Sequence, residues 1–303
     1  MIAIDIMGGD NAPVVVLQGA VAAARKGVAV QLYGPEDLIL RWFASHAVAW
    51  QELPITIVAS QEVIEMNEEP VFAVRKKPGA SLVKAVESVA RGTCSATLSA
   101  GNSGAMMAAS ALIIGRLPGV ERPAIAGYLP TSKGVVLALD LGANTECRPQ
   151  HFLQFAHLGS MHLREAKGIE NPRVGLLSNG HEDNKGSVLG KEAFALLKQD
   201  SGINFIGNVE PCHIFAHDVD VVVCDGFSGN VLLKTMEATT DLIKQWYPDI
   251  LSDLDDRLSH KQLGGALLLG VKGTAIICHG NADAKTMEQA IMFAWDISHH
   301  SAK

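Results

Sequence analysis

Short apolar segments alternate with helical patterns along most of the chain. Apolar or β-branched runs predict strands at Ile2–Met7, Ala29–Tyr33, Ile55–Val58, Ala96–Ser99, Val135–Leu141, Val174–Ser178, Asp220–Cys224 and Thr274–Cys278. Between them, apolar residues at helical spacing predict helices at Val14–Arg25, Ser81–Arg91, Ser103–Arg116, Pro149–Lys167, Ser187–Lys198, Asn230–Trp246 and Lys285–Ser298. This alternation predicts an α/β fold with a mostly parallel, doubly wound sheet. No repeat or linker-like stretch interrupts the pattern, so we expect a single domain over residues 1–303.

Residues 241–263 depart from this rhythm. Apolar residues recur there at i, i+3 and i+4 spacing, interrupted by Pro248, and the other positions are largely acidic. The pattern is typical of an amphipathic helical excursion. It favours a hairpin that packs on the body of the protein or on a dimer partner. A surface that contacts lipid is the alternative, although acidic side chains oppose binding to anionic headgroups.

Composition and charge exclude several classes of protein. The chain has 303 residues, of which 48% are hydrophobic, so a disordered or fibrous protein is excluded. Its net charge is −7, which gives no support for a general nucleic-acid binder. The 5 cysteines lack CxxC spacing and indicate buried thiols in a reducing compartment. The start Met1–Asp5 does not resemble a signal peptide, and no long apolar run occurs, so we expect a cytoplasmic protein.

Four Gly-rich turns follow predicted strands and precede predicted helices. They span residues 8–11, 99–104, 225–230 and 279–281. In a parallel sheet, such turns meet at the carboxyl edge of the strands, where open α/β folds bind ligands. Their backbone N–H groups and the following helix starts favour an anion. Ordinary tight turns have the same composition, but the repetition at one edge favours a shared phosphate or carboxylate site.

The turn at residues 180–187 carries an unusual lysine. Its sequence is Gly-His-Glu-Asp-Asn-Lys-Gly-Ser, so Lys185 and Gly186 are in the reverse order of a Walker loop, and a nucleotide site is not predicted. A helix start repels cations, so Lys185 there indicates a bound anion, unless it is an exposed surface lysine.

Other kinds of site lack support. The sequence contains no GxSxG, no HExxH and no GxGxxG, so it predicts neither a hydrolase nucleophile nor a metal, and no NAD, flavin or other cofactor. A basic cluster at Arg75, Lys76 and Lys77 stands out from the acidic average. It is either a solvated face or a surface that attracts an acidic partner.

Motifs from residue 2 to about residue 295 resemble one family. They are Ile4–Pro13, Ser99–Ala105, Glu121–Ala124, Asp140–Asn144, Gln154–Ala156, Asn204–Glu210, Cys224–Val231 with Leu233–Thr235, Gly264–Ala266, Leu268–Gly270 and His279-Gly280. In this order they resemble the phosphate acyltransferases of bacterial phospholipid synthesis, the PlsX family. The chain departs from the family pattern at Ser178–Gly186, at Leu267 and in the short segment 241–263.

The resemblance implies a homodimeric α/β/α protein, similar in fold to phosphotransacetylases and isopropylmalate dehydrogenases. The implied reaction converts long-chain acyl-[acyl carrier protein] and inorganic phosphate to acyl phosphate and free carrier protein, without a cofactor. The acyl phosphate would feed glycerol-3-phosphate acylation by a membrane acyltransferase, so peripheral membrane contact is also implied. Carrier protein is acidic, which makes Arg75, Lys76 and Lys77 candidates to bind it.

The predicted turns fit this chemistry because phosphate is itself the nucleophile. We expect Lys185 to hold phosphate or the developing charge, with Asn230 as a neutral donor. The candidate phosphate-binding and substrate-binding residues are Asp5, Gly8, Gly9, Asp10, Asn11, Ser99, Gly101, Asn102, Ser103, Asp225, Gly226, Ser228 and Gly229. Asp5, Asp10 or Asp225 could orient donors or accept a proton. Helix capping is the competing role for Asp10 and, less strongly, for Asp225.

Three other functions stay open at this stage. A short-chain phosphotransacetylase would use coenzyme A instead of carrier protein. A regulator could bind acyl groups or phosphate without catalysis. A metal-dependent NAD dehydrogenase is an alternative by analogy of fold alone.

Overall fold

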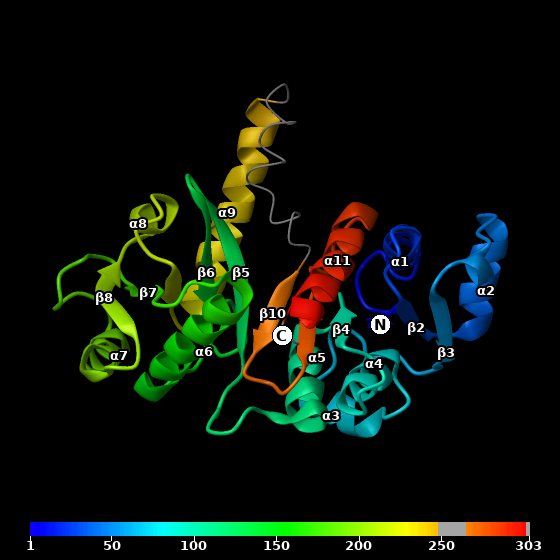
Figure 1. The fold of residues 1–303 in the computed structure, drawn as a ribbon, viewed down its shortest axis with the longest axis horizontal. Coiled ribbons are helices and arrows are strands. Elements are labelled where there is room, and N and C mark those ends of the chain that lie inside the picture. The colour runs from blue at the N-terminus through cyan, green and yellow to red at the C-terminus, as the bar shows by residue number, and fades with distance from the viewer. Residues whose placement is uncertain (248–264, 301–303) are drawn as a thin grey trace. The chain divides into compact units, whose positions relative to one another are not determined.

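The computed structural model describes residues 1–247 and 265–300. The chain divides into two compact units, Met1–Pro118 with Lys261–Lys303, and Gly119–His260. Figure 1 shows strands and flanking helices in each unit. The predicted α/β fold is therefore confirmed.

The sheet of the first unit is mostly parallel. Its strand order is β3-β2-β1-β4-β11-β10, and only the β10–β11 pair within it is antiparallel. The strands are β1 (Ile2–Asp5), β2 (Val30–Gly34), β3 (Ile55–Ala59), β4 (Ala96–Ser99), β10 (Ala266–Leu269) and β11 (Thr274–Ile277). All residues of β1 and β4 are buried, as expected for strands covered on both faces.

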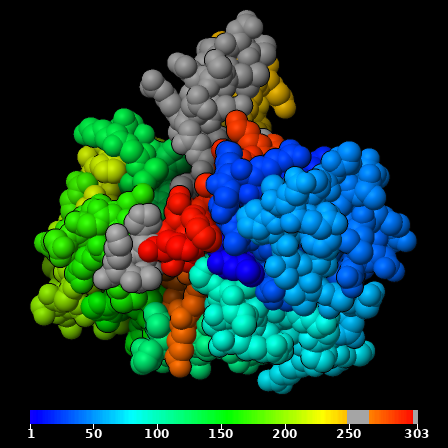
Figure 2. Space-filling model, turned by 45° about the vertical axis from the view of Figure 1, so that its right-hand side comes forward, coloured from blue at the N-terminus to red at the C-terminus, as the bar shows by residue number. Residues whose placement is uncertain are grey.

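Helices flank the sheet of this unit (Figure 1). They are α1 (Val14–Arg25), α2 (Glu36–Ser45), the 3₁₀ turn Trp50–Glu52, α3 (Pro70–Lys76), α4 (Ser81–Ala90), α5 (Ser103–Ala109), the π-helical segment Ser110–Gly115 and α11 (Ala284–His300). Helix α1 packs against α11, and a Cβ atom on Gly19 would lie 2.5 Å from Cβ of Met287. Figure 2 shows the C-terminal helix in red beside the N-terminal segment in blue.

The second unit contains β5 (Ala124–Thr131), β6 (Gly134–Leu139), β7 (Arg173–Leu177), β8 (Asn204–Val209) and β9 (Val221–Val223). They lie in the order β5-β6-β9-β7-β8, antiparallel between β5 and β6 and parallel elsewhere. The helices are α6 (Pro149–Lys167), α7 (Val188–Gln199), α8 (Pro211–Phe215) and α9 (Gly226–Trp246). The loops after β6, β7 and β9 therefore leave the sheet at one edge.

The predicted excursion at residues 241–263 is only partly described. Its first residues, to Trp246, are the end of α9, and residues 248–264 lie outside the described residues. Within the described ranges, no helix combines the length and the apolar character needed to cross a bilayer.

Candidate active site

Three of the Gly-rich turns meet in the first unit, at the carboxyl ends of the parallel neighbours β1, β4 and β11. The backbone N of Asp10 donates to the carbonyl of Gly280 at 2.8 Å. A Cβ atom on Gly8 would lie 2.5 Å from the N of Gly101, so the first two turns touch. Gly9 has a φ of +110°, which a residue with a side chain rarely adopts. The predicted gathering of turns is observed for these three.

Asp5 holds two of these turns together. Its buried carboxylate accepts hydrogen bonds from the hydroxyls of Ser81 and Ser99, at 2.6 and 2.7 Å, and from the N of Met7 at 3.1 Å. Burial raises the pKa of Asp5, and the hydrogen bonds act in the opposite direction. Ser99 also accepts from the N of Gly101. Asp5 and Ser99 therefore bind each other in this structure.

The side chain of Asn102 is fully used inside the protein. Its Oδ1 accepts from the N of Ala105, which caps α5, and its Nδ2 is within 3.3 Å of the carbonyls of Glu65, Met66 and Glu68. The expectation that its amide donates to phosphate is therefore not met by this arrangement. Ser103, the first residue of α5, is exposed.

The capping roles of the two candidate aspartates are the reverse of the expected ones. Helix α1 begins at Val14 after Pro13 without a side-chain cap, so Asp10, which is exposed like Asn11, does not cap it. Asp225 caps α9, since its Oδ1 accepts from the N of Ser228 at 2.9 Å and its Oδ2 accepts from Oγ of Ser228 at 2.8 Å. This carboxylate already satisfies the positive end of α9.

The fourth Gly-rich turn lies in the second unit, against the loop after β6. A Cβ atom on Gly226 would lie 2.7 Å from the carbonyl O of Asn144, and one on Gly229 would overlap the carbonyl of Asp140. Close packing therefore requires these two glycines without any ligand. Asn230 is exposed, and a Cβ atom on Gly142 would lie 3.6 Å from its Oδ1.

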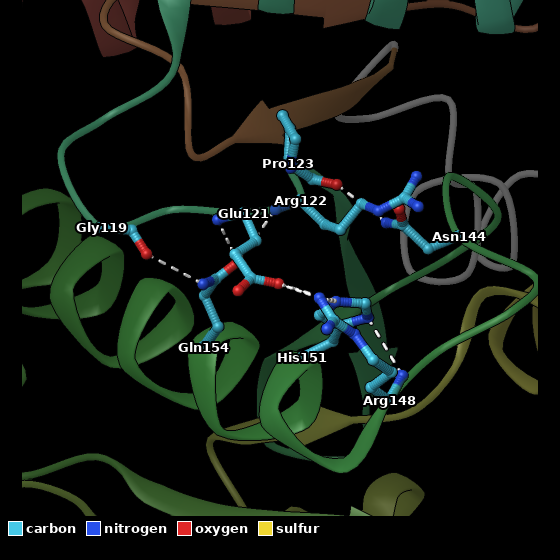
Figure 3. Close-up of polar contacts among 8 residues, drawn as sticks. All are labelled: Gly119, Glu121, Arg122, Pro123, Asn144, Arg148, His151 and Gln154. Atoms are coloured by element: carbon cyan, nitrogen blue, oxygen red, sulfur yellow. Dashed lines mark hydrogen bonds and ion pairs between the residues drawn. The ribbon is translucent and has the colours of Figure 1, made fainter.

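Asp140 shapes that loop from inside the protein. Its side chain, fully buried, accepts from the backbone N of Ile125, Gly142, Ala143 and Asn144 and from Nδ2 of Asn144. Burial raises its pKa, and these hydrogen bonds oppose the shift. Asn144 also donates to the carbonyl of Pro123 at 2.8 Å (Figure 3). The loop therefore offers a fixed surface to the start of α9.

The motif at residues 121–123 is held by the start of α6 (Figure 3). Oε1 of Gln154 accepts from the backbone N of Glu121 and of Arg122, both at 3.0 Å. The carboxylate of Glu121 pairs with Arg148 and lies 3.4 Å from Nε2 of the buried His151. Burial is the main cause that lowers the pKa of His151. These side chains are thus tied to one another beside the Asp140 loop.

The loop that carries Lys185 is ordered by amide side chains. The N of Gly186 donates to Oδ1 of Asn179 at 3.0 Å, and Nδ2 of Asn208 donates to the carbonyl of Glu182 at 2.8 Å. Ser187 caps α7 through the N of Gly190. The side chain of Lys185 lies over Gly180, whose Cβ atom would come 2.8 Å from its Cγ. The pKa of Glu182 is lowered mainly because its carboxylate accepts a hydrogen bond from its own backbone N–H. The positive charge of Lys185 acts in the same direction.

Lys185 lines a cavity of about 1090 Å³ within the second unit. Its polar lining gathers at the ends of β7, β8 and β9 and in the loops that follow: Ser178, Asn179, Lys185, Ser187, Asn208, Asp225 and Ser228. Most of the other lining residues are apolar and come from β5, α6, β7, α8 and α9: Pro130, Phe152, Leu176, Leu177, Pro211, Phe215, Phe227, Val231, Leu232, Met236 and Ile243, with Thr235, Thr239 and Thr240. Gly186, Gly190 and Cys224 complete the lining. Asn230 is not among the residues that line it.

Ser178 is a cavity residue that the sequence did not reveal as functional. Its Oγ is buried, and among the described residues it has no hydrogen-bond partner. It follows directly after β7, and a polar residue after a buried strand was the available signal. With Lys185 it could bind an anionic group at the polar end of the cavity.

The basic cluster lies on α3 of the first unit. Arg75 and Lys76 are exposed, and Nζ of Lys76 lies 5.4 Å from the ring centre of Phe72, itself 62% exposed. Nζ of Lys77 instead pairs with Glu68 at 2.6 Å and donates to the carbonyl of Val63 at 2.7 Å. Two of the three predicted cations are thus available to a partner at this surface. In the part of the chain that the structure describes, no cluster of His, Cys, Asp and Glu could hold a metal ion.

Known proteins resemble this chain over nearly its full length. The sequence profile of a family described as fatty acid synthesis protein matches residues 1–302. The chain is 43% identical to the phosphate acyltransferase of Trichlorobacter lovleyi, over 97% of this chain and 90% of the relative. It is also 43% identical to that of Pelotomaculum thermopropionicum, with the same coverage of 97% and 90%.

Solved structures with low sequence identity share the fold. A phosphotransacetylase from Streptococcus pyogenes is similar with a TM-score of 0.68 at 16% identity, covering 100% of this chain and 94% of that one. A branched-chain phosphotransacylase from Enterococcus faecalis is similar with a TM-score of 0.65 at 16% identity, covering 99% and 100%. The expected likeness in fold to phosphotransacetylases is therefore confirmed.

Proposed function

Because the chain belongs to the PlsX family of phosphate acyltransferases, we propose that it transfers a long-chain acyl group from acyl carrier protein to inorganic phosphate. The acyl phosphate would then acylate glycerol-3-phosphate in phospholipid synthesis. The observation that carries this proposal is the cavity in which Lys185 stands at a polar end and apolar side chains form most of the remaining wall.

The reaction needs few protein groups. An oxygen of HPO₄²⁻ attacks the carbonyl carbon of the thioester, and the carbon–sulfur bond breaks. The sulfur leaves as the thiol of the carrier protein after it receives the proton that phosphate loses. No electron donor or further reactant is required. The protein must hold phosphate against the carbonyl, which can contribute about 7–11 kcal/mol of barrier reduction as effective molarity.

We assign the phosphate to the polar end of the cavity. Lys185 supplies a positive charge there, and the hydroxyl of Ser178 supplies a donor that has no partner among the described residues. Asp225 lines the same cavity, and of the three candidate carboxylates we assign it as the proton acceptor. The backbone turns around Gly8, Gly101 and Gly280 are a further place where phosphate could be bound.

The carrier protein would dock on α3. Arg75 and Lys76 provide positive charge for its acidic surface, and the exposed ring of Phe72 beside them provides apolar contact. Lys77 is excluded from this role because its amine is bound to Glu68 and Val63.

Two further properties follow from the same assignment. We expect a homodimer, and the exposed residues Ala238 and Leu242 of α9 offer apolar contacts for a second copy. We also expect reversible membrane contact, because Trp246 and Tyr247 at the end of α9 are 64% and 55% exposed.

The test is the forward reaction of the purified full chain. Long-chain acyl carrier protein is incubated with phosphate, and acyl phosphate is trapped as the hydroxamate by hydroxylamine. We expect product only when both substrates are present. Product from acyl-coenzyme A but not from acyl carrier protein would instead identify a coenzyme A-dependent phosphotransacylase. No product from either donor would refute the proposal and leave the non-catalytic regulator.

A further inference from the structure

We infer that α9 forms the binding wall for the hydrocarbon chain and that its residues from Leu232 to Ile243 determine how long a chain the protein accepts. This inference rests on the proposed function for its thioester head group. It adds where the hydrocarbon chain lies and which way it points, from the Lys185 end of the cavity along α9.

The direction follows from how polarity is distributed. Apart from three threonines of α9, the polar lining residues come from the loops after β7 and β9 and from Asn208 near the end of β8. Beyond Ser228, α9 contributes the apolar residues Val231, Leu232, Met236 and Ile243. An acyl thioester has the same polarity, with a polar reacting group at one end and methylenes along the rest. The polar end of the substrate therefore belongs beside Lys185, and its chain belongs beside α9.

Two of the three threonines that α9 contributes to the cavity lining have their hydroxyls bonded to the helix itself. Oγ1 of Thr239 donates to the carbonyl of Thr235 at 2.7 Å, and Oγ1 of Thr240 donates to the carbonyl of Met236 at 2.8 Å. Because both hydroxyls are bonded to the helix backbone, the methyl groups remain as the contact surface for a ligand.

The length of the wall suits a membrane-type acyl chain. From Ser228 to Ile243 a helix rises about 22 Å, at about 1.5 Å per residue. A lipid chain spans half of a hydrocarbon core of about 30 Å. The wall is therefore longer than such a chain, and a residue partway along α9 can meet its end.

Two substitutions at different points along α9 test the inference. Leu232→Trp fills the cavity near the polar end, and Thr240→Phe fills it about 12 Å further along the helix. Asp241→Phe is the matched control, since it adds an aromatic ring on α9 at an exposed residue outside the cavity lining. Circular dichroism and thermal unfolding verify that each variant is folded.

The first measurement is kcat/KM for acyl carrier proteins with chains of about 10 to 18 carbons, where each buried methylene contributes roughly fourfold. We expect Thr240→Phe to lose at least about tenfold with the longest chains only, and Leu232→Trp to lose activity with medium chains as well. Asp241→Phe should keep the wild-type profile. Identical chain-length profiles in wild type and both cavity variants would overturn the inference.

A binding measurement separates this inference from the proposed reaction. Isothermal titration with a series of n-alkyl phosphonates reports chain binding without turnover. In the wild type, affinity should rise with chain length, and in the two cavity variants this rise should stop at a shorter chain. That result supports the inference even if no acyl phosphate is formed. If acyl phosphate forms but the two cavity variants bind every phosphonate as the wild type does, the reaction is supported and the role of α9 is refuted.

Discussion

Asp140 binds Asn144 twice, through the backbone N at 2.6 Å and through Nδ2 at 2.8 Å. The N of Gly226 then donates to the carbonyl of Asn144 at 2.8 Å, so this pair fixes the place where α9 begins. Helix α9 in turn forms one wall of the cavity that contains Lys185. A buried carboxylate that does not itself line the cavity thus positions the cavity wall.

The first prediction concerns Asp140→Asn. The amide would place an NH₂ group against N–H donors, so we expect the free energy of unfolding to fall by about 3 kcal/mol. Urea denaturation followed by circular dichroism measures this loss. Asp241→Asn, at an exposed position on α9, is the control and should change stability by less than about 0.5 kcal/mol. Equal stability of the two variants would show that the buried hydrogen bonds contribute little.

The second prediction concerns Lys185. Lys185→Ala should reduce kcat at least about 100-fold, which is typical for the loss of a group that stabilises an oxyanion. Lys191→Ala removes an exposed charge from α7 outside the cavity lining and should leave kcat close to wild type. Steady-state kinetics at saturating phosphate distinguish the two. Near-normal turnover in Lys185→Ala would show that this exposed lysine has no part in the reaction.

The third prediction concerns docking of the carrier protein on α3. The double variant Arg75→Glu, Lys76→Glu should raise the KM for acyl carrier protein and flatten its dependence on salt, with little change in kcat. The double variant Lys133→Glu, Lys191→Glu makes the same change in net charge at exposed positions elsewhere. If both double variants raise the KM equally, net charge rather than α3 attracts the carrier protein.

The fourth prediction concerns stability in acid. Burial lowers the pKa of His162 to about 4, and its Nε2 lies 2.8 Å from the hydroxyl of Tyr128. Between pH 6.5 and about 4, the unfolded chain binds a proton that the folded chain rejects. The free energy of unfolding should therefore decrease as the pH is lowered from 6.5 to about 4, by up to about 3.4 kcal/mol.

Replacement of His162 tests this assignment. His162→Gln removes the titrating group and should flatten the decline in stability between pH 6.5 and 4, as measured by urea denaturation at each pH. His181→Gln changes an exposed imidazole and should leave the decline in place. An unchanged decline in His162→Gln would mean that other groups cause the acid lability.

Several elements were predicted closely because local pattern decides them. Val14–Arg25 and Pro149–Lys167 form helices with the predicted bounds, and Ala96–Ser99 is a strand as predicted. Strands β5 and β8 were not predicted, because Pro130 and Gly207 interrupt segments whose strand character depends on pairing with neighbours. Ser103–Arg116, predicted as one helix, changes to π-helical geometry at Ser110.

The candidate site was predictable where a residue conflicts with its local setting. Lys185 was found because a cation near a helix start is unexpected, and it lines the cavity. Ser178 and Met236 were not found, because a serine after a strand and a methionine in a helix are ordinary residues until the fold places them in one cavity. Gly226 and Gly229 were predicted to approach a ligand, but their close approach is to the loop at Asp140–Asn144.

Ser228 and Ile243 belong to one uninterrupted helix. The separation between the polar start of the wall and its far end is therefore set by the rise of the peptide backbone, in the way that a rigid rod sets the distance between its ends. If α9 tilts or shifts as a body, both ends move together and their spacing is preserved. Selection of chain length by such a wall should therefore vary little with temperature, even where the overall rate changes strongly.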